Sequence, residues 1–267
     1  MGKNSGISWT DHTFNPWIGC TKVSEGCKFC YAEARDKRFD NGIHWGPNAP
    51  RKVTSVHNHN EPRRWDREAK KLNIRYRVFC ASLADVFDLE APEGEREKLW
   101  PLIKETDSLD WLLLTKRPEN WKMMLPKDWG VGYNNVWLGM TTEDQETFDK
   151  RLPYLQEVKA KIKWLSVEPQ IGYIEFMGGL VNTRGIADRS FDWVVFGGES
   201  GNVNEVRSFD PEWMRPLIAC RESFYTKVFV KQMGSIYAKT HGYKDEKGKD
   251  PEEWEEWMRI QEFPNEA

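Results

Sequence analysis

Long apolar runs are absent from this 267-residue sequence, and no stretch approaches the roughly 20 residues that a membrane-spanning helix needs. The sequence shows no N-terminal signal segment, and it contains little cysteine, 5 residues, an odd number. Disulfides are rare in the reducing cytosol. We therefore expect a cytoplasmic protein with no membrane association, whose cysteines serve some purpose other than disulfide bonding.

A strong net charge is also missing, because the formal value is only -3 at pH 7, so bulk charge does not predict binding to a polyanion. The charge is unevenly distributed. Residues 51–77 contain nine Lys or Arg and three acids, whereas residues 245–267 contain nine acids and three bases. The basic stretch predicts either a phosphate-facing patch or, as is more usual for charge runs, a solvated helix face. The acidic stretch predicts a C-terminal helix that begins at Asp250-Pro251.

Internal repeats and low-complexity linkers are lacking too, so a single domain over residues 1–267 is expected. What the chain does contain is a series of short apolar runs, rich in β-branched and aromatic residues. The runs are nearly continuous rather than alternating, which is typical of parallel strands buried on both faces. The expected strands are 7–10, 77–82, 111–115, 136–140, 163–167, 192–196 and 227–231.

Helical patterns fill the gaps between these runs and predict helices over 93–105, 142–156 and 210–221, the last two with capping signals. Alternating strands and helices imply right-handed crossovers. We predict an α/β fold, a parallel (β/α) barrel, full or partial, of six to seven strand–helix units. A doubly wound open sheet is the alternative. Residues 172–189 are expected to form a long loop.

Three of the five cysteines lie close together, at Cys20, Cys27 and Cys30, and Phe29 directly precedes the last of them. Three thiolates in one loop can bind three irons of a four-iron cluster. The fourth iron would then stay open for a ligand or substrate. This spacing therefore makes the chain a candidate redox enzyme.

A structural zinc site is the main alternative for these cysteines. Zinc usually takes four protein ligands, and His12, His44 or a more distant group would have to supply the fourth. The spacing does not match the usual zinc-finger pattern. Unliganded thiols are the third interpretation.

Polar residues follow every expected strand. In parallel α/β folds ligands bind at the carboxyl ends of the strands, so these residues predict one polar rim and an active site there. The double glycine would let a ligand approach the backbone, or would only form a turn. The rim residues are Ser82, Asp85, Thr141, Glu143, Glu168, Gly197, Gly198 and Glu199, with the cations Lys116, Arg117 and Lys231.

A three-cysteine loop after the first strand of a (β/α) barrel resembles the radical S-adenosylmethionine superfamily. The usual motif there is Cys-x3-Cys-x2-Cys with an aromatic before the last cysteine. Residues 27–30 match its second half, whereas six residues separate Cys20 from Cys27 where three are usual. Nearly the whole chain also resembles the three-Cys-motif phage proteins, a group of unassigned function. The stretches that carry this second resemblance are 9–17, 26–32, 82–88, 114–118, 138–141, 166–169 and 197–201.

The superfamily resemblance implies that the three cysteines hold a [4Fe–4S] cluster whose open iron binds S-adenosylmethionine. An external electron donor would reduce the cluster, and cleavage of the cofactor would yield a 5'-deoxyadenosyl radical that abstracts hydrogen from a substrate. The implied cofactor contacts are Phe29 at the adenine, Ser82 and Asp85 at the methionine amine, Thr141 with Glu143 or Glu168 at the ribose hydroxyls, and Glu199 at an amine or a ribose hydroxyl beside Gly197 and Gly198.

Three cations, Lys116, Arg117 and Lys231, would then be left as catalytic-site residues for an anionic substrate. With the basic stretch, they suggest a nucleotide or a modified base within DNA. The competing function is a zinc- or cluster-bearing nucleic-acid-binding module without redox chemistry. The 14 tryptophans favour that module slightly, whereas convergent Lys, Arg and Glu residues disfavour it.

Overall fold

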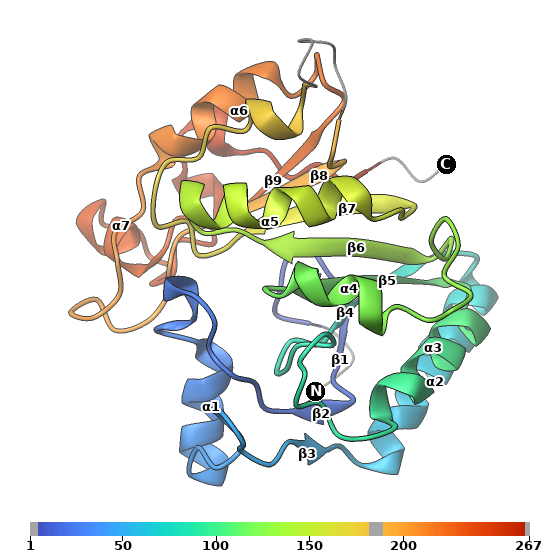
Figure 1. The fold of residues 1–267 in the computed structure, drawn as a ribbon. Coiled ribbons are helices and arrows are strands. Elements are labelled where there is room, and N and C mark those ends of the chain that lie inside the picture. Colours follow the sequence, from blue (N-terminus) through green and yellow to red (C-terminus); the bar gives the residue numbers. More distant parts are fainter. Residues whose placement is uncertain (1–4, 182–188, 265–267) are drawn as a thin grey trace. The chain divides into compact units, whose positions relative to one another are not determined.

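The computed structural model describes residues 5–181 and 189–264 of the chain (Figure 1). Seven strands form one sheet in the order β1-β4-β5-β6-β7-β8-β9. Because this order follows the chain and never reverses, the sheet has no switch point of the doubly wound kind. The predicted class, a parallel (β/α) barrel, full or partial, is confirmed in its partial form. The strands are β1 His12–Phe14, β4 Tyr76–Cys80, β5 Leu109–Thr115, β6 Val136–Thr141, β7 Ile162–Val167, β8 Trp193–Gly197 and β9 Lys227–Gln232.

Helices alternate with these strands along the chain (Figure 1), and a short antiparallel pair, β2 Trp17–Ile18 with β3 Lys52–Val53, precedes the second long helix. Among the described residues, none of the helices combines the length and the apolar character that crossing a bilayer requires. The helices are α1 Tyr31–Asp40, α2 Val56–Leu72, α3 Glu95–Glu105, α4 Trp121–Met124, α5 Gln145–Glu157, α6 Arg215–Cys220 and α7 Ser235–Thr240.

The chain divides into two compact units, which are described separately below. Unit 1 consists of Met1–Val23, Cys30–Gly139 and Val158–Lys161. Unit 2 consists of Ser24–Phe29, Met140–Glu157 and Ile162–Ala267. The predicted single-domain organisation stays a prediction.

Unit 1 is built on β1, β4 and β5, which pair in parallel. The run Leu109–Thr115 is almost wholly buried, as expected for a strand covered on both faces. Helix α2 packs against β4 and β5 and buries Trp65 and Ala69. Its ends carry local signals, because Ser55 accepts a hydrogen bond from the Asn58 amide and Asn73 closes the helix in the left-handed conformation.

Unit 2 contains β7, β8 and β9, which also pair in parallel. Large aromatic side chains fill its core, including Trp164 and Trp193 with ring centroids 5.3 Å apart. Phe176 lies edge-on to Phe148 and Phe196. Burial among other rings therefore explains several tryptophans of this chain without any role in base stacking.

The first strand lies further along the chain than the expected 7–10. Residues before it form a turn in which the Thr10 amide donates to the Ile7 carbonyl over 3.2 Å. The strand begins at His12, which pairs with Val78 of β4. His12 is 2% exposed and stacks on Trp65. Histidine does not by itself predict a buried strand, but here its ring is buried against another aromatic ring.

The predicted C-terminal helix over 245–267 is wrong for the residues described. Two short 3-10 turns, Pro251–Glu253 and Glu256–Met258, take its place, and residues 265–267 lie outside the described part. Asp250 caps the first turn as expected, by accepting from the Glu252 amide. The chain leaves this turn at once, because Trp254 and Glu255 are extended.

The expected loop over 172–189 is described only in part. It contains one 3-10 turn, Met177–Gly179, and residues 182–188 lie outside the described residues. The predicted helices over 93–105 and 142–156 correspond to α3 and α5. The helix predicted over 210–221 begins as a 3-10 turn capped by Asp210 and continues as α6.

Candidate functional site

In unit 1 the segment before Cys20 runs beside the residues that follow β4. The Gly19 amide donates to the Leu83 carbonyl over 3.0 Å, and Gly19 forms a parallel bridge with Ala84. Gly19 has a φ of +116°, and a Cβ there would lie 2.3 Å from the His44 carbonyl oxygen. Only glycine therefore allows this approach, which brings Cys20 to the carboxyl end of β4.

The Cys20 sulfur lies beside a buried ion pair from the ends of β4 and β5. One guanidinium nitrogen of Arg117, Nη1, is 3.5 Å from Cys20 Sγ and 2.9 Å from Asp85 Oδ2. The other, Nη2, donates to the Thr21 carbonyl. Burial, and then the Asp85 carboxylate, raise the pKa of the Cys20 thiol to about 12, and Arg117 opposes this rise.

Asp85 is 5% exposed and its carboxylate is fully used. It accepts from the Thr115 hydroxyl at 2.8 and 2.9 Å, and from the Phe87 amide at 2.9 Å. The Lys116 amide adds a contact of 3.3 Å. Although burial opposes protonation of Arg117, the Asp85 charge raises the pKa of its guanidinium, so Arg117 stays protonated.

Thr21, the residue after Cys20, is fixed by a second buried arginine. Arg51 Nη2 donates to the Thr21 hydroxyl over 2.7 Å, and that hydroxyl donates to Glu90 over 2.8 Å. Arg51 also pairs with Asp88 and Glu90. The three carbonyls that its Nη1 contacts belong to His44, Gly46 and Ala49. Arg51 thus connects the cysteine segment with two loops and faces no solvent.

Cys30 caps the beginning of α1 and packs beside a small apolar cluster of Ile18, Ala32 and Leu83. Its neighbour Tyr31 donates its phenolic hydroxyl to the Ser82 carbonyl over 2.5 Å. Cys20 and Cys30 are therefore both held near the residues that follow β4.

In unit 2 the segment Ser24–Phe29 carries Cys27 on a 3-10 turn, Glu25–Cys27. The Ser24 hydroxyl is 3.7 Å from Cys27 Sγ and donates to Glu143 Oε1 over 2.7 Å. Glu143 is completely buried, and its other oxygen accepts from Arg151 over 2.8 Å. A Cβ on Gly26 would lie 2.3 Å from Glu143 Cγ. Glu143 thus supports the Cys27 turn from the end of β6.

Phe29 is also contacted within unit 2. The Arg207 guanidinium lies 5.6 Å from the centre of its ring, a cation–π distance. Glu199, after β8, binds Arg207 through both carboxylate oxygens, at 2.6 and 3.0 Å. Arg207 also lies 3.9 Å from Glu25. One arginine therefore connects the double-glycine segment with the cysteine turn.

A second ion pair lies at the carboxyl ends of the unit 2 strands. Lys231 of β9 contacts Glu168, which follows β7, at 2.6 Å, and both side chains are partly accessible. A Cβ on Gly197 would lie 2.8 Å from Glu168 Oε1. The absence of a side chain at Gly197 therefore leaves room for the Glu168 carboxylate between the ends of β7 and β9.

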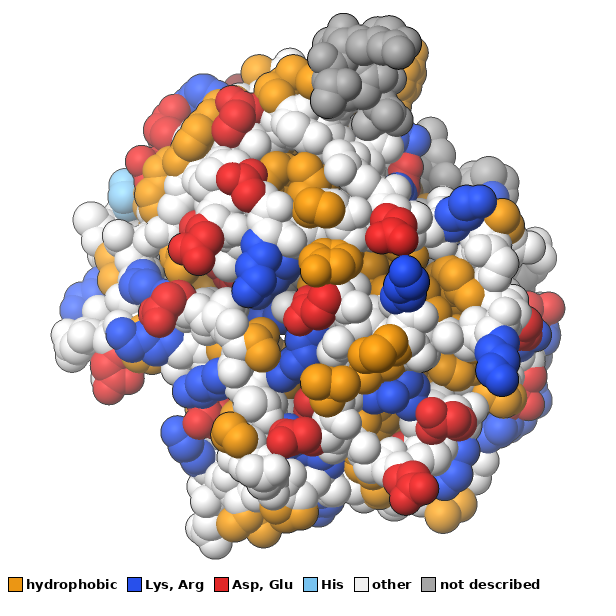
Figure 2. All heavy atoms as spheres, viewed as in Figure 1, with side chains coloured by type: hydrophobic (Ala, Val, Ile, Leu, Met, Phe, Trp, Pro, Cys, Tyr) orange, Lys and Arg blue, Asp and Glu red, His pale blue; other side chains and the backbone are white. Residues whose placement is uncertain are grey.

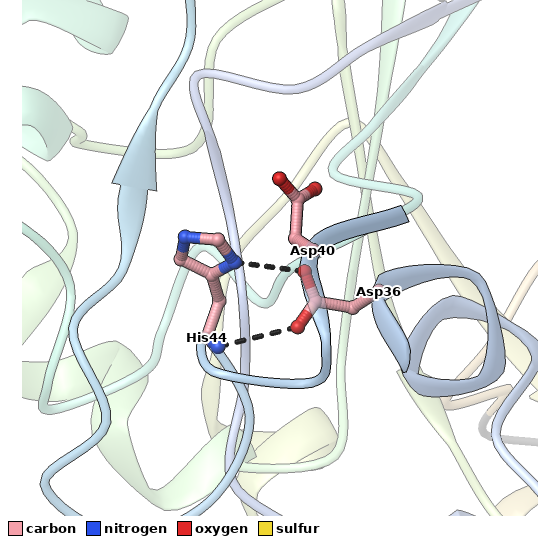
Figure 3. Close-up of side chains that lie close together, drawn as sticks. All are labelled: Asp36, Asp40 and His44. Atoms are coloured by element: carbon pink, nitrogen blue, oxygen red, sulfur yellow. Dashed lines mark hydrogen bonds and ion pairs between the residues drawn. The ribbon is translucent and has the colours of Figure 1, made fainter. Parts of the chain in front are cut away.

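Asp36, Asp40 and His44 form a separate group near the end of α1, with one ligand atom each within 4.8 Å (Figure 3). Asp36 accepts from both the ring Nδ1 and the amide of His44, at 2.8 and 3.2 Å. Asp40 accepts from Lys52 over 2.7 Å. These contacts give the group a structural role, because they hold the turn after α1 in place.

The basic stretch 51–77 is largely neutralised by ion pairs. Figure 2 shows Lys and Arg interspersed with Asp and Glu over the face in view, without a broad patch of one sign among the described residues drawn there. The pairs in this stretch are Arg51–Asp88, Lys52–Asp40, Arg63–Glu105, Arg64–Glu61, Lys70–Asp66, Arg75–Asp110 and Arg77–Asp11.

The predicted site residues thus fall into two groups. Unit 1 brings together Cys20, Cys30, Ser82, Asp85, Lys116 and Arg117, all at the ends of β4 and β5 or in the segments beside them. Unit 2 holds Cys27, Phe29, Thr141, Glu143, Glu168, Gly197, Gly198, Glu199 and Lys231. Sequence reasoning missed Arg51, Arg151 and Arg207, because no local pattern marks an arginine whose partners are distant in the chain.

The three thiols are the type of donor that an iron–sulfur cluster takes from a protein. Cys20, Cys27 and Cys30 are free thiols, and each is partly exposed. Thiolate sulfur is the ligand that such clusters take from proteins. Burial and Asp85 raise the pKa of the Cys20 thiol, and Arg117 opposes this rise by favouring the deprotonated form that would bind iron.

Comparisons with known proteins place the chain in a family. Residues 4–260 match the family described as protein of unknown function DUF5131, and the chain belongs to this family. No curated protein matches it in sequence. Among solved structures, it is similar to a spore photoproduct lyase variant with bound AdoMet and dinucleoside spore photoproduct. The TM-score is 0.48 at 12% identity, and the match covers 84% of this chain and 64% of that one.

Proposed function

We propose that this protein is a radical S-adenosylmethionine enzyme in which Cys20, Cys27 and Cys30 hold a [4Fe–4S] cluster. The observation that carries the proposal is the setting of Cys20. A free thiol lies at the carboxyl end of a parallel strand, 3.5 Å from a buried arginine. Ligand sites in (β/α) barrels form at this end of the sheet. The resemblance of the cysteine loop to the superfamily motif also supports the proposal.

When bound, the cluster would supply one electron to cleave the carbon–sulfur bond of S-adenosylmethionine, after reduction by an external donor. The residues of this chain would bind and orient that cofactor. Ser82 is assigned to the methionine amine, Phe29 to the adenine, and Thr141 and Glu168 to the ribose hydroxyls.

Some of the predicted contact residues are already committed to other partners. Asp85 and Glu143 are buried and fully hydrogen-bonded, so we assign them to positioning Cys20 and the Cys27 turn. Glu199 is bound by Arg207, which places it beside Phe29 and Gly198 as a support of the adenine contact.

The proposed substrate carries a phosphate, and we favour a nucleotide over a base within duplex DNA. Lys116 and Lys231 are the cations assigned to its phosphate, and Lys231 also contacts Glu168 at 2.6 Å. Arg117 is taken by Asp85 and Cys20. The ion pairs within 51–77 leave little net positive charge for a long polyanion, which binds through many unpaired cations.

The test is an anaerobic incubation of reconstituted protein with dithionite and S-adenosylmethionine, read by mass spectrometry. We expect 5'-deoxyadenosine to form, and to form faster when a nucleotide that serves as the substrate is added. A Lys231→Met variant should lose that acceleration. Acceleration by duplex DNA, with no acceleration by any nucleotide, would identify DNA as the substrate instead. A clustered protein that forms no 5'-deoxyadenosine would contradict the proposed activity.

A further inference from the structure

We infer that Arg117 and Asp85 are positioning residues that set the reduction potential of the cluster, with opposite signs. This inference rests on the proposed function, since it assumes that Cys20 binds iron. The role concerns Arg117 and Asp85 and not the cysteines, because neither Arg117 nor Asp85 would bind the iron. Both act through the sulfur of Cys20.

The geometry gives Arg117 a direct path to the cluster. Its Nη1 lies 3.5 Å from Cys20 Sγ, within hydrogen-bonding reach of a sulfur acceptor. The guanidinium is held by two further contacts, to Asp85 and to the Thr21 carbonyl, so it has little freedom to move away. Hydrogen bonds and positive charge at a cluster sulfur stabilise the reduced form, which carries one more negative charge.

Asp85 places a negative charge on the other side of the same nitrogen, 2.9 Å away. Both side chains are 7% exposed, so water screens their charges poorly. The carboxylate disfavours added electron density on Cys20, whereas the guanidinium favours it. The reduction potential should therefore reflect the balance between the two charges, and removing either one should move it in a defined direction.

The chain also contains a matched control on the same two strands. Arg75 directly precedes β4, and it pairs with Asp110 near the start of β5 through a contact of 2.6 Å. Asp110 is buried like Asp85. This Arg–Asp pair lies at the amino ends of the strands, opposite the end that holds Cys20. Its removal should leave the cluster unaffected.

The experiment is an anaerobic redox titration of the reconstituted protein, followed by electron paramagnetic resonance of the reduced cluster. Arg117→Gln should shift the midpoint potential to more negative values, and Asp85→Asn should shift it to more positive values. The double variant should lie between them. Arg75→Gln should match the wild type. Iron per protein is measured in each sample, so that loss of cluster is separated from a change of potential.

Opposite shifts would support the inference, because a purely structural role would lower iron content in both variants without reversing the sign. Shifts in the same direction, or unchanged potentials with iron retained, would overturn it and leave the proposed function standing. If Arg117→Gln loses its iron, Asp85→Asn decides alone, and a potential equal to or more negative than that of the wild type, with iron retained, would overturn the inference. Wild-type protein that holds no iron would remove both proposals.

Discussion

Single residues at this site are fixed by partners that lie far along the chain. Arg117 and Cys20 are 97 positions apart, and Ser24 and Glu143 are 119 apart. Three buried arginines, Arg51, Arg117 and Arg151, each compensate a carboxylate. Arg51 and Arg117 contact Thr21 directly, whereas Arg151 contacts Glu143, which accepts from Ser24. Burying a charge is costly unless it is paired, so removing one partner should be felt strongly.

Glu143 offers the clearest test of this point. Glu143→Ala should lower the free energy of unfolding by about 3–5 kcal/mol, because it leaves Arg151 as a buried uncompensated charge. The Ser24 contact is lost as well, so the Cys27 turn loosens. Urea denaturation measures the change.

Glu212→Ala is the matched control, since Glu212 also contacts an arginine, Arg215, at 2.6 Å. The Glu212 side chain is 59% exposed and water screens its charge, so its loss should leave stability nearly unchanged. Equal effects of the two substitutions would contradict the structural role of Glu143.

The sequence predicts the cysteines of this site well and their supports poorly. Cys20, Cys27 and Cys30 lie within eleven positions, so their spacing is visible in the chain. Arg117 was expected to face a substrate, because it follows an apolar run. Its actual partners depend on how the chain folds back, which a strand-end rule does not contain.

At the scale of elements, strands were easier to predict than the segments at either end of the chain. The runs for β4 to β9 are continuous and apolar, and each became a buried strand. β1 was misplaced because His12 and Thr13 are not typical of a buried strand. The acidic helix was predicted from its cap alone, and a cap does not determine how far a helix continues.

A side chain at Gly198, between the ends of β8 and β9, should lower the stability of the protein. A Cβ there would lie 2.3 Å from the Met233 carbonyl oxygen and 2.9 Å from Phe209 Cβ. Because the nearest atom belongs to the backbone, Gly198→Ala should cost about 1–3 kcal/mol in the free energy of unfolding. Thermal or urea denaturation measures the loss.

Gly178→Ala is the control for this substitution, because its Cβ would meet only Leu152 Cδ2, at an ordinary 3.7 Å. We expect a change within about 0.5 kcal/mol there. A Gly198→Ala protein as stable as Gly178→Ala would mean that the two strand ends are not packed as described.

For the whole molecule, alternation of apolar runs and helical patterns was enough to predict the fold class. It predicted neither the ion pairs that neutralise the basic stretch nor the arginines that support the cysteines. Charge runs are local in sequence, whereas their compensation is decided by the folded chain. For this reason we favour a nucleotide over DNA among the two predicted substrates.

The most direct test of the central claim is the metal content of anaerobically reconstituted protein, with its absorbance spectrum. We predict about four irons and four sulfides per chain and broad absorbance near 400 nm, as a [4Fe–4S] cluster gives. Cys20→Ala, Cys27→Ala and Cys30→Ala should each lose most of the iron. Cys220→Ala should retain it, since Cys220 belongs to α6. One zinc per chain and no iron would contradict the claim.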